Sequence, residues 1–268
     1  MTSPFSLFSY NLQFMHEAED AKVFKATDMT GKQFVVKFTL VYGNYDPAAH
    51  EVYSELMTIN HPNLVKVFEV GIIMPQHPEY KQLYNMMNWD YDNGSVAEVS
   101  LPTNTAIPYV LMEYIDGVSV DNKSEIEPIS LCQDMLAAIK VLQNHSIVHD
   151  DVQTQNILFD PTNNRYVLID FDLSYHDADG EDTHRDVDLF MEVLLHVLRV
   201  NQPVTNSLLP NTTAINKFYN ATVTMISPDL GVDDYTTLLS QLLGGDYVLT
   251  LPLEHGVTEV WQHGVRIQ

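Results

Sequence analysis

The sequence predicts an α+β fold in which a small sheet-rich lobe is followed by a mostly helical lobe. The first half carries short runs of β-branched and aromatic residues, and the second half carries apolar residues at helical spacing. Every apolar run is shorter than a membrane span, and 268 residues suffice for one large domain or two small ones. We place the lobes at residues 1–115 and 116–268, with a hinge near residues 113–118.

The expected small lobe opens with three β-prone runs. They are residues 12–15, 23–26 and 33–40, with a turn at 29–32 (MTGK) between the last two. A helix is expected over residues 48–59, because Val52, Leu56 and Ile59 fall on one helical face.

Two further strands of the small lobe are expected at residues 64–73 and 109–115. Between them lies the stretch 74–107, which is rich in Pro, Asn and Tyr and shows no clear period. We interpret it as an insertion between neighbouring strands. Insertions of this length often bind partners, but they equally serve as plain surface loops.

The expected helical lobe begins with an amphipathic helix over residues 129–144, in which Leu131, Met135, Ile139 and Leu142 recur at helical spacing. The elements after it are two short strands joined by the turn DPTNN and then three helices: residues 157–159, 166–169, 187–200, 213–226 and 233–243.

The charge of the chain is strongly acidic. It holds 36 Asp and Glu against 13 Lys and Arg, a formal net charge of −23. Such a field repels nucleic acid and anionic membranes and attracts basic partners or metal ions, although solubility alone would also explain it. The single cysteine, Cys132, excludes an intramolecular disulfide, and no Lys or Arg precedes the first apolar residues as in a secretory signal. We therefore expect a cytoplasmic protein.

Three polar residues near the start of the helical lobe form the main candidate site. Asp151 lies in a loop after a helix, Asn156 at the mouth of a strand, and Asp170 at the end of the next strand. A two-stranded hairpin would bring Asn156 and Asp170 together, and an amide oxygen beside a carboxylate suits Mg²⁺. Asp151 would then be available to accept a proton from a hydroxyl. A base beside two metal ligands is the apparatus of phosphoryl transfer.

The small lobe supplies a candidate cation. Lys37 lies in the strand QFVVKFTL with apolar residues on both sides. A lone lysine in an apolar strand usually turns its ammonium outward to water. Here it could instead pair with phosphates and with a carboxylate from the following helix, for which Glu51 is the candidate and Glu55, one turn later, the fallback.

Several segments, in order over about residues 10–200, resemble the protein kinase superfamily. They are VVKF around Lys37, HPNLVKVFEVG, YVLMEYIDG, HDDVQTQN, IDFD and RDVDLFMEVLLHVL. In that order they are similar to the phosphate-binding lysine strand, the segment after the first large helix, the hinge, the H-x-D-x-x-x-x-N catalytic loop, the metal-binding D-F-G and the helix that anchors the catalytic loop. Each motif alone is weak, but the shared order is specific. The resemblance implies a bilobal protein-kinase-like fold.

The resemblance also implies ATP and Mg²⁺, or Mn²⁺, as cofactors. Asp151 would be the catalytic base, Lys37 and Gln153 would stand near the transferred phosphate, and Asn156 and Asp170 would hold the metal. The residues that would contact the nucleotide or support those contacts come from the strands, the helix and the hinge of the small lobe: Lys37, Glu51, Met112, Glu113, Ile115, Ala21 and Val23.

The glycine-rich loop of the family is missing. Aligning Val23 with the valine of G-x-G-x-x-G-x-V puts His16, Ala18 and Ala21 at the glycine positions. Alanine lets the backbone approach phosphates less closely, and Glu17 and the neighbouring acids would repel them. We expect weak nucleotide binding, a loop that swings away, or a metal that screens these acids.

The region after the metal motif also departs from the family. Only thirteen residues separate Asp172, which replaces the D-F-G glycine, from Asp186, and there is no A-P-E. Asp150 replaces the arginine that senses a phosphate on a long activation segment, so we do not expect regulation by phosphorylation there. Gln153 stands where Ser/Thr kinases carry a lysine, and its amide can donate a hydrogen bond but brings no charge.

Three functions remain open on the sequence. The first is an atypical serine/threonine protein kinase, because the residues needed for phosphoryl transfer are all of the right types. The second is a small-molecule kinase of the aminoglycoside or choline type, favoured by the short activation segment and the missing lysine. The third is a pseudokinase scaffold, favoured by the lost glycines. The acidic surface suits a basic substrate in either kinase. Similar small kinases also act as viral or bacterial effectors, which would place the chain in a host cell's cytoplasm.

Overall fold

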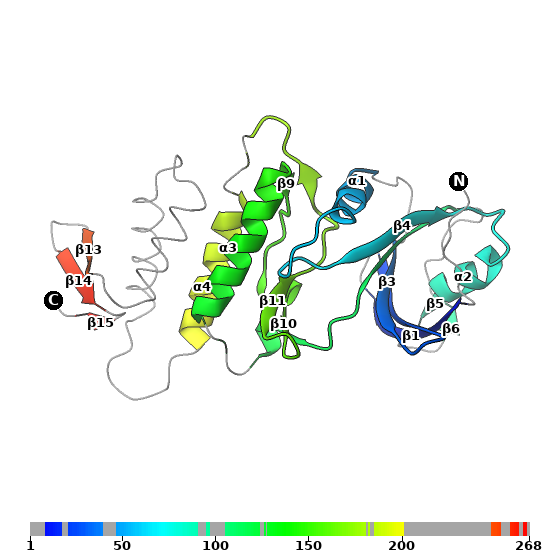
Figure 1. Cartoon of the computed structure of the whole chain (residues 1–268), viewed down its shortest axis with the longest axis horizontal. Coiled ribbons are helices and arrows are strands. Elements are labelled where there is room, and N and C mark those ends of the chain that lie inside the picture. The colour runs from blue at the N-terminus through cyan, green and yellow to red at the C-terminus, as the bar shows by residue number, and fades with distance from the viewer. Residues whose placement is uncertain are drawn as a thin grey trace. The chain divides into compact units, whose positions relative to one another are not determined.

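The computed structural model divides the chain into two compact units, whose elements are drawn in Figure 1. It describes residues 9–17, 21–39, 47–90, 95–96, 105–123, 126, 128–180, 182, 185–200, 248–252, 258–262 and 265–266. The first unit takes Met1–His61 and Val65–Ile115, and the second takes Pro62–Leu64 and Asp116–Gln268. The main boundary falls between Ile115 and Asp116, and a short segment of the first half belongs to the second unit.

A five-stranded antiparallel sheet forms the frame of the first unit. Its strands are β1 (Tyr10–Glu17), β2 (Ala21–Asp28), β3 (Gln33–Thr39), β4 (Val67–Ile73) and β7 (Ile107–Glu113). They lie side by side in the order β1-β2-β3-β7-β4. Successive side chains of a strand point to opposite faces, and Phe34, Val36 and Phe38 of β3 are accordingly buried together. The α+β class expected from the sequence is confirmed.

The turn between β2 and β3 is fixed by Asp28. Its Oδ1 accepts hydrogen bonds from the backbone N–H of Thr30 at 2.8 Å and of Lys32 at 2.9 Å. Gly31 has a φ of 87°, in the left-handed region where glycine carries no Cβ penalty. The turn expected at residues 29–32 is therefore confirmed.

The described helices of the first unit are α1 (Pro47–Leu56) and α2 (Tyr80–Met87). The helix α1 ends three residues short of the limit expected at residue 59. The helix α2 lies inside the 74–107 stretch, followed by the paired strands β5 (Trp89–Asp90) and β6 (Ser95–Val96). The expectation of one main helix in this lobe therefore missed α2.

The apolar side chains of α2 belong to the core of the first unit. They share one buried cluster with the strands of the sheet, and its members are Phe24, Ala26, Phe34, Val36, Phe38, Ile73, Tyr80, Leu83, Met87, Ile107, Tyr109 and Leu111. The described part of the insertion is thus a packed cover over the sheet. Eight residues are too few for a helical period to stand out between the flanking prolines and asparagines.

Two long helices dominate the described part of the second unit, α3 (Pro128–Asn144) and α4 (Arg185–Val200). They lie side by side in Figure 1. The predicted face of α3 is confirmed, because Leu131, Met135, Ile139 and Leu142 are all fully buried. The helices expected at residues 213–226 and 233–243 lie outside the described residues.

Short strands of the second unit connect these helices. The described ones are β8 (Val118–Ser119), β9 (Ile147–Val148), β10 (Ile157–Asp160), β11 (Arg165–Leu168), β12 (Tyr175–His176), β13 (Val248–Pro252), β14 (Thr258–Gln262) and β15 (Val265–Arg266). They form three small sheets, β11-β10-β8, β12-β9 and β13-β14-β15. The single turns of 3₁₀ helix at Val120–Asn122 and Thr154–Asn156 complete the path. The hairpin expected from the turn DPTNN is confirmed as β10–β11.

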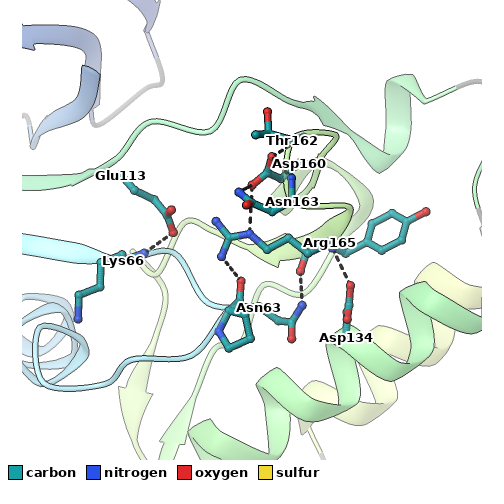
Figure 2. Close-up of polar contacts among 10 residues, drawn as sticks. Asn63, Lys66, Glu113, Asp134, Asp160, Thr162, Asn163 and Arg165 are labelled. Carbon is teal, nitrogen blue, oxygen red and sulfur yellow. Dashed lines mark hydrogen bonds and ion pairs between the residues drawn. The ribbon is translucent and has the colours of Figure 1, made fainter. Parts of the chain in front are cut away.

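The 62–64 segment joins the second unit through the β10–β11 hairpin, as Figure 2 shows. The side-chain amide of Asn63 donates to the Tyr166 carbonyl at 2.8 Å, and the Leu168 N–H donates to the Asn63 carbonyl at 2.9 Å. The guanidinium of Arg165 donates to the Pro62 carbonyl. The strand expected from residue 64 therefore begins only at β4, because Leu64 bridges to Leu168 instead.

No helix in the described ranges combines the length and the apolar character that crossing a membrane requires.

Candidate functional site

The candidate site centres on the 149–156 loop of the second unit, which starts after β9 and ends with the 3₁₀ turn before β10. His149 at its start is fully buried and packs edge-on against the ring of Phe171 at 4.5 Å. Its Nδ1 lies 3.2 Å from the Asp151 N–H and its Nε2 lies 3.0 Å from the Ile169 carbonyl. Burial holds the pKa of His149 below its ordinary value, so the ring is neutral, accepting at Nδ1 and donating from Nε2.

The carboxylate of Asp186, at the start of α4, fixes the backbone of this loop. Its Oδ2 accepts the His149 N–H at 2.8 Å and its Oδ1 accepts the Asp150 N–H at 2.9 Å. Burial raises the pKa of Asp186, and the two backbone donors act against that rise. Asp150 has a φ of 60°, which few non-glycine residues adopt without support.

Asp151 carries the carboxylate at the centre of the loop, and its partners among the described residues are side-chain amides. The Gln153 amide nitrogen lies 3.0 Å from Oδ1 and 2.9 Å from Oδ2. The Asn156 amide nitrogen donates to Oδ2 at 2.6 Å and also to the Asp151 carbonyl at 3.0 Å. The structure thus brings together Asp151, Gln153 and Asn156, and it orients the half-buried carboxylate by uncharged donors.

Asn156 and Asp170 are linked through the backbone. The Ile169 N–H donates to the Asn156 carbonyl at 2.9 Å, and Asp170 follows directly with a φ of 65°. Asp170 lies two residues beyond the end of β11 rather than at its last residue. The sharp turn of the chain there is a local conformation that the strand pattern does not predict.

The chemistry of Asn156 and Asp170 fits a small hard cation. The Asn156 amide nitrogen is engaged by Asp151, so its oxygen is the atom of that side chain suited to a metal. The ranges that the structure describes contain no group of three or more His, Cys, Asp or Glu side chains placed for a metal. One carboxylate and one amide nevertheless suffice for Mg²⁺, which keeps several waters and binds substrate phosphates.

Lys37 lies in β3 of the first unit, with only 7% of its surface exposed. Val23 of β2 and Val110 of β7 are its paired neighbours in the sheet. The ammonium group does not reach out from an exposed strand face, as a lone strand lysine usually does. On α1, Glu51 is exposed, whereas Glu55 is half-buried.

The last residues of β7 are tied to the chain ahead of β4, also within the first unit (Figure 2). The Glu113 N–H donates to the Lys66 carbonyl at 2.9 Å, and the Lys66 N–H donates to the Glu113 Oε1 at 2.8 Å. Met112 beside it is buried. Because its N–H is engaged, Glu113 cannot donate to a ligand from its backbone.

The hairpin of β1 and β2 carries an ion pair where the family has its glycine-rich loop. Lys22 is fully buried, and its Nζ lies 2.9 Å from Glu17 Oε1 directly across the two strands. Ala21 is also fully buried, Val23 is half-buried, and residues 18–20 lie outside the described part of the chain. The expected repulsion of phosphates by Glu17 is weakened, because its charge is offset by Lys22.

Two ion pairs near the candidate residues were not predicted from the sequence. The guanidinium of Arg185 donates from Nε to Asp150 Oδ1 at 2.5 Å, and the buried Lys22 pairs with Glu17. The second pair leaves a signal, since a Glu and a Lys flank the tip of a predicted hairpin. The first leaves none, because thirty-five positions separate its partners.

Comparison with known proteins gives partial similarity to kinases, and no protein-family model matches the chain. Over 86 residues, 30% of this chain, it is 26% identical to a probable serine/threonine-protein kinase, fnkB, of Dictyostelium discoideum. Over 96 residues, 33% of this chain, it is 34% identical to the serine/threonine-protein kinase PknB of Mycolicibacterium smegmatis. These matches cover 16% and 15% of the two kinases, so the chain spans about a sixth of the length of these curated relatives. They support a kinase-like relationship over about a third of the chain.

Proposed function

We propose that this chain is an ATP-dependent phosphotransferase, an atypical serine/threonine protein kinase that transfers the γ-phosphate of ATP to a protein hydroxyl. The observation that carries the proposal is the Asp151 carboxylate, held by the amides of Gln153 and Asn156, with no ion pair to it among the described residues. A carboxylate oriented in this way can accept the proton of an attacking hydroxyl. The similarity of part of the chain to two serine/threonine kinases supports the same activity.

Asp151 would act as the general base. As the acceptor oxygen bonds to the γ-phosphorus and the bond to the leaving β-phosphate oxygen breaks, its proton passes to the Asp151 carboxylate. The neutral ring of His149 helps to hold the backbone of Asp151 in place, because its Nδ1 accepts the Asp151 N–H. Gln153 would hold the carboxylate in place and can turn its amide toward a phosphate oxygen, without the charge of a lysine.

Asn156 and Asp170 would hold Mg²⁺ or Mn²⁺. When bound, such an ion would neutralise the charge on the phosphate oxygens of ATP. On the side of the protein, the 149–156 loop would keep the Asn156 oxygen and the Asp170 carboxylate adjacent through the Ile169–Asn156 hydrogen bond.

The first unit would bind the nucleotide. Lys37 would pair with phosphates, and Glu51 on α1 would pair with Lys37, with the half-buried Glu55 as the alternative. The adenine would contact residues of β2, of β7 and of the segment that follows β7. These residues are Ala21, Val23, Met112, Glu113 and Ile115. Glu113 would contribute its carbonyl oxygen, because its N–H is donated to Lys66.

The acceptor would be a basic protein of the cytoplasm, because the chain carries a net charge of −23. Nucleic acid and anionic membranes would be repelled by the same field. The 74–107 insertion would offer a surface to a protein partner. One described part of that surface is the exposed side of α2, which lies opposite the buried residues Tyr80, Leu83 and Met87.

A small-molecule kinase is the second candidate, and one observation favours it. Gln153, exposed beside Asp151, brings no positive charge to a phosphate in transfer. A small cationic acceptor would supply that charge itself. The two candidates differ in the acceptor alone.

The test is incubation with γ-labelled ATP and Mg²⁺ or Mn²⁺, with and without basic model proteins or small polyamine and aminocyclitol acceptors. We expect label on a basic protein with the native chain and none with Asp151→Ala. Asp188→Asn is the matched control, because Asp188 is an exposed acid in the first turn of α4.

Each outcome decides between the candidates. Label on a small acceptor only would move the proposal to a small-molecule kinase. Label that persists in Asp151→Ala would remove Asp151 as the base. Loss of both label and ATP-dependent thermal stabilisation in the native chain would leave a pseudokinase scaffold.

A further inference from the structure

The first two residues of α4 hold two consecutive residues of the 149–156 loop. Asp186 accepts the backbone N–H groups of His149 and Asp150, at 2.8 and 2.9 Å. Arg185 donates from its side chain to the carboxylate of Asp150, at 2.5 Å. The backbone of Asp150 is therefore held by one of these residues and its side chain by the other.

Asp150 is a position where such support matters. Its φ of 60° lies in the left-handed region, which aspartate tolerates better than most residues but which still costs free energy. Asp151 follows directly, so a change in the backbone of Asp150 would redirect the candidate base. Strained conformations of this kind persist only where the surroundings hold them.

The ion pair lies within a set of acidic and phenolic groups from the segment before α4. Arg185 faces Asp150, Tyr175 and Asp182, and its hydrogen bond to the Asp150 carboxylate is the main cause that raises the pKa of the guanidinium. The Tyr175 hydroxyl donates to Asp182 at 2.7 Å, and the Asp182 N–H donates to Asp177 at 3.0 Å. The negative charge around Arg185 is therefore supplied by Asp side chains and needs no added phosphate.

The described hydroxyls of the 171–185 segment are already engaged. Ser174 is buried, and its Oγ donates to the His149 carbonyl at 3.1 Å. Tyr175 donates to Asp182 and lies in β12, paired with β9. Ser174 and β12 thus fix the described part of the segment against His149 and β9.

We propose that Arg185 is a positioning residue that holds the catalytic loop through Asp150, so that the loop presents Asp151 without a phosphate being added to the segment before α4. In a kinase regulated by phosphorylation, an arginine of the loop binds a phosphate on the segment that follows. Here the charges are reversed, because the loop carries the acid Asp150 and α4 carries the cation Arg185. This role rests on the proposed phosphotransferase function.

The experiment compares Arg185→Gln, Asp150→Asn and the double variant with the native chain, using Lys32→Gln as the matched control. Lys32 is an exposed cation between β2 and β3 of the other unit. For each protein, kcat and the nucleotide KM are measured, together with amide hydrogen exchange of peptides covering residues 147–153. Arg185→Gln and Asp150→Asn should each lower kcat roughly three- to tenfold, as expected for a half-exposed pair, with little change in KM.

The double variant should be no worse than either single variant, because both remove the same contact. Exchange at residues 147–153 should rise by at least about threefold in the Arg185 and Asp150 variants and stay unchanged in Lys32→Gln. Additive losses of kcat, or unchanged exchange in Arg185→Gln, would overturn the positioning role.

Failure of this proposal and failure of the proposed function give different results. If the native chain transfers no phosphate but Arg185→Gln still loosens the loop, the function falls and the structural role of the pair stands. If the native chain is active and Arg185→Gln matches it in kcat and exchange, the function stands and the role of Arg185 falls. Activity that also drops after phosphatase treatment would show that an added phosphate is needed, which contradicts the proposal.

Discussion

Asp160 and Asp151 stand on either side of the 3₁₀ turn in the second unit, and their surroundings are opposite. Asp160 is buried and accepts from the backbone of Thr162 and Asn163, from the Asn163 amide at 2.7 Å and from the Arg165 guanidinium at 3.1 Å. Asp151 is half-buried, and its hydrogen-bond partners in the described part of the chain are side-chain amides. The charge of Asp160 is thus offset by Arg165, and its oxygens are occupied by the donors of a turn. The carboxylate of Asp151 is oriented by uncharged donors.

The difference separates a structural acid from a candidate catalytic one. Burial opposes the ionisation of Asp160, but the hydrogen bonds from Asn163 and Arg165 outweigh it and lower the pKa of its carboxyl below the ordinary value. Arg165 in turn donates to the Pro62 carbonyl, so Asp160 helps to hold the 62–64 segment in place (Figure 2). A group committed to these partners is poorly suited to receive a proton from a substrate.

The same substitution at the two positions should give the largest contrast in activity. Asp151→Asn removes the proton acceptor, and we expect phosphate transfer to fall roughly 10²–10⁴-fold, the usual contribution of general base catalysis. Asp160→Asn should leave kcat within a few-fold of native at temperatures where the protein is folded. Steady-state assays of the purified variants measure both effects. Equal losses of kcat in the two variants would remove the distinction.

Stability should respond in the reverse order. Asp160→Asn removes the charge that pairs with Arg165 and places an amide donor against the Asn163 amide, so we expect a loss of about 2 kcal/mol in the free energy of unfolding. Asp151→Asn should lower it by about 1 kcal/mol or less, because the carboxylate is only half-buried and its Gln153 partner is exposed. Urea titration monitored by circular dichroism reports the two midpoints. A larger loss for Asp151→Asn would show that its amide contacts hold the loop together.

The pH dependence of stability should also differ. Because the folded pKa of Asp160 lies below its unfolded value, its contribution is present above about pH 4 and is lost as pH falls through the lower folded pKa. Native protein should therefore lose stability relative to Asp160→Asn between pH 4 and pH 2. Unfolding curves of both proteins across this range give the difference. A constant difference over these pH values would contradict the assignment of the lowered pKa to Asp160.

The smallest expected effect comes from giving Asp151 a cation of its own. Gln153→Lys would place an ammonium beside the Asp151 carboxylate, and an exposed pair of this kind should change stability by about 0–1 kcal/mol. Transfer to a neutral acceptor should rise by at most about tenfold, because the added charge can meet the transferred phosphate. Transfer to a basic acceptor should change less, because that acceptor already brings positive charge. Parallel assays with neutral and basic peptides separate these two results.

Elements with a clear local period could be predicted from the sequence. The face of α3 and the β10–β11 hairpin were predicted because side-chain periodicity and turn residues are local properties of the chain. The helix α2 was not, because its eight residues acquire their helical role by packing Tyr80, Leu83 and Met87 into a core built by distant strands. The sequence also placed Leu64 in a strand of the first unit. It could not show that Leu64 pairs with Leu168, because the two residues are far apart in the chain and meet only in the folded protein.

For the candidate site, the sequence by itself determined which chemistry lies together along the chain. Asp151, Gln153 and Asn156 fall within one short loop, so their spacing alone brought them into contact. Only the tertiary structure decided how that loop is held: by Asp186 and Arg185 of α4, by the neutral His149, and by the left-handed turns at Asp150 and Asp170. The physical reason is that spacing limits what neighbours in sequence can reach, whereas burial, strain and distant partners are fixed only when the whole chain packs.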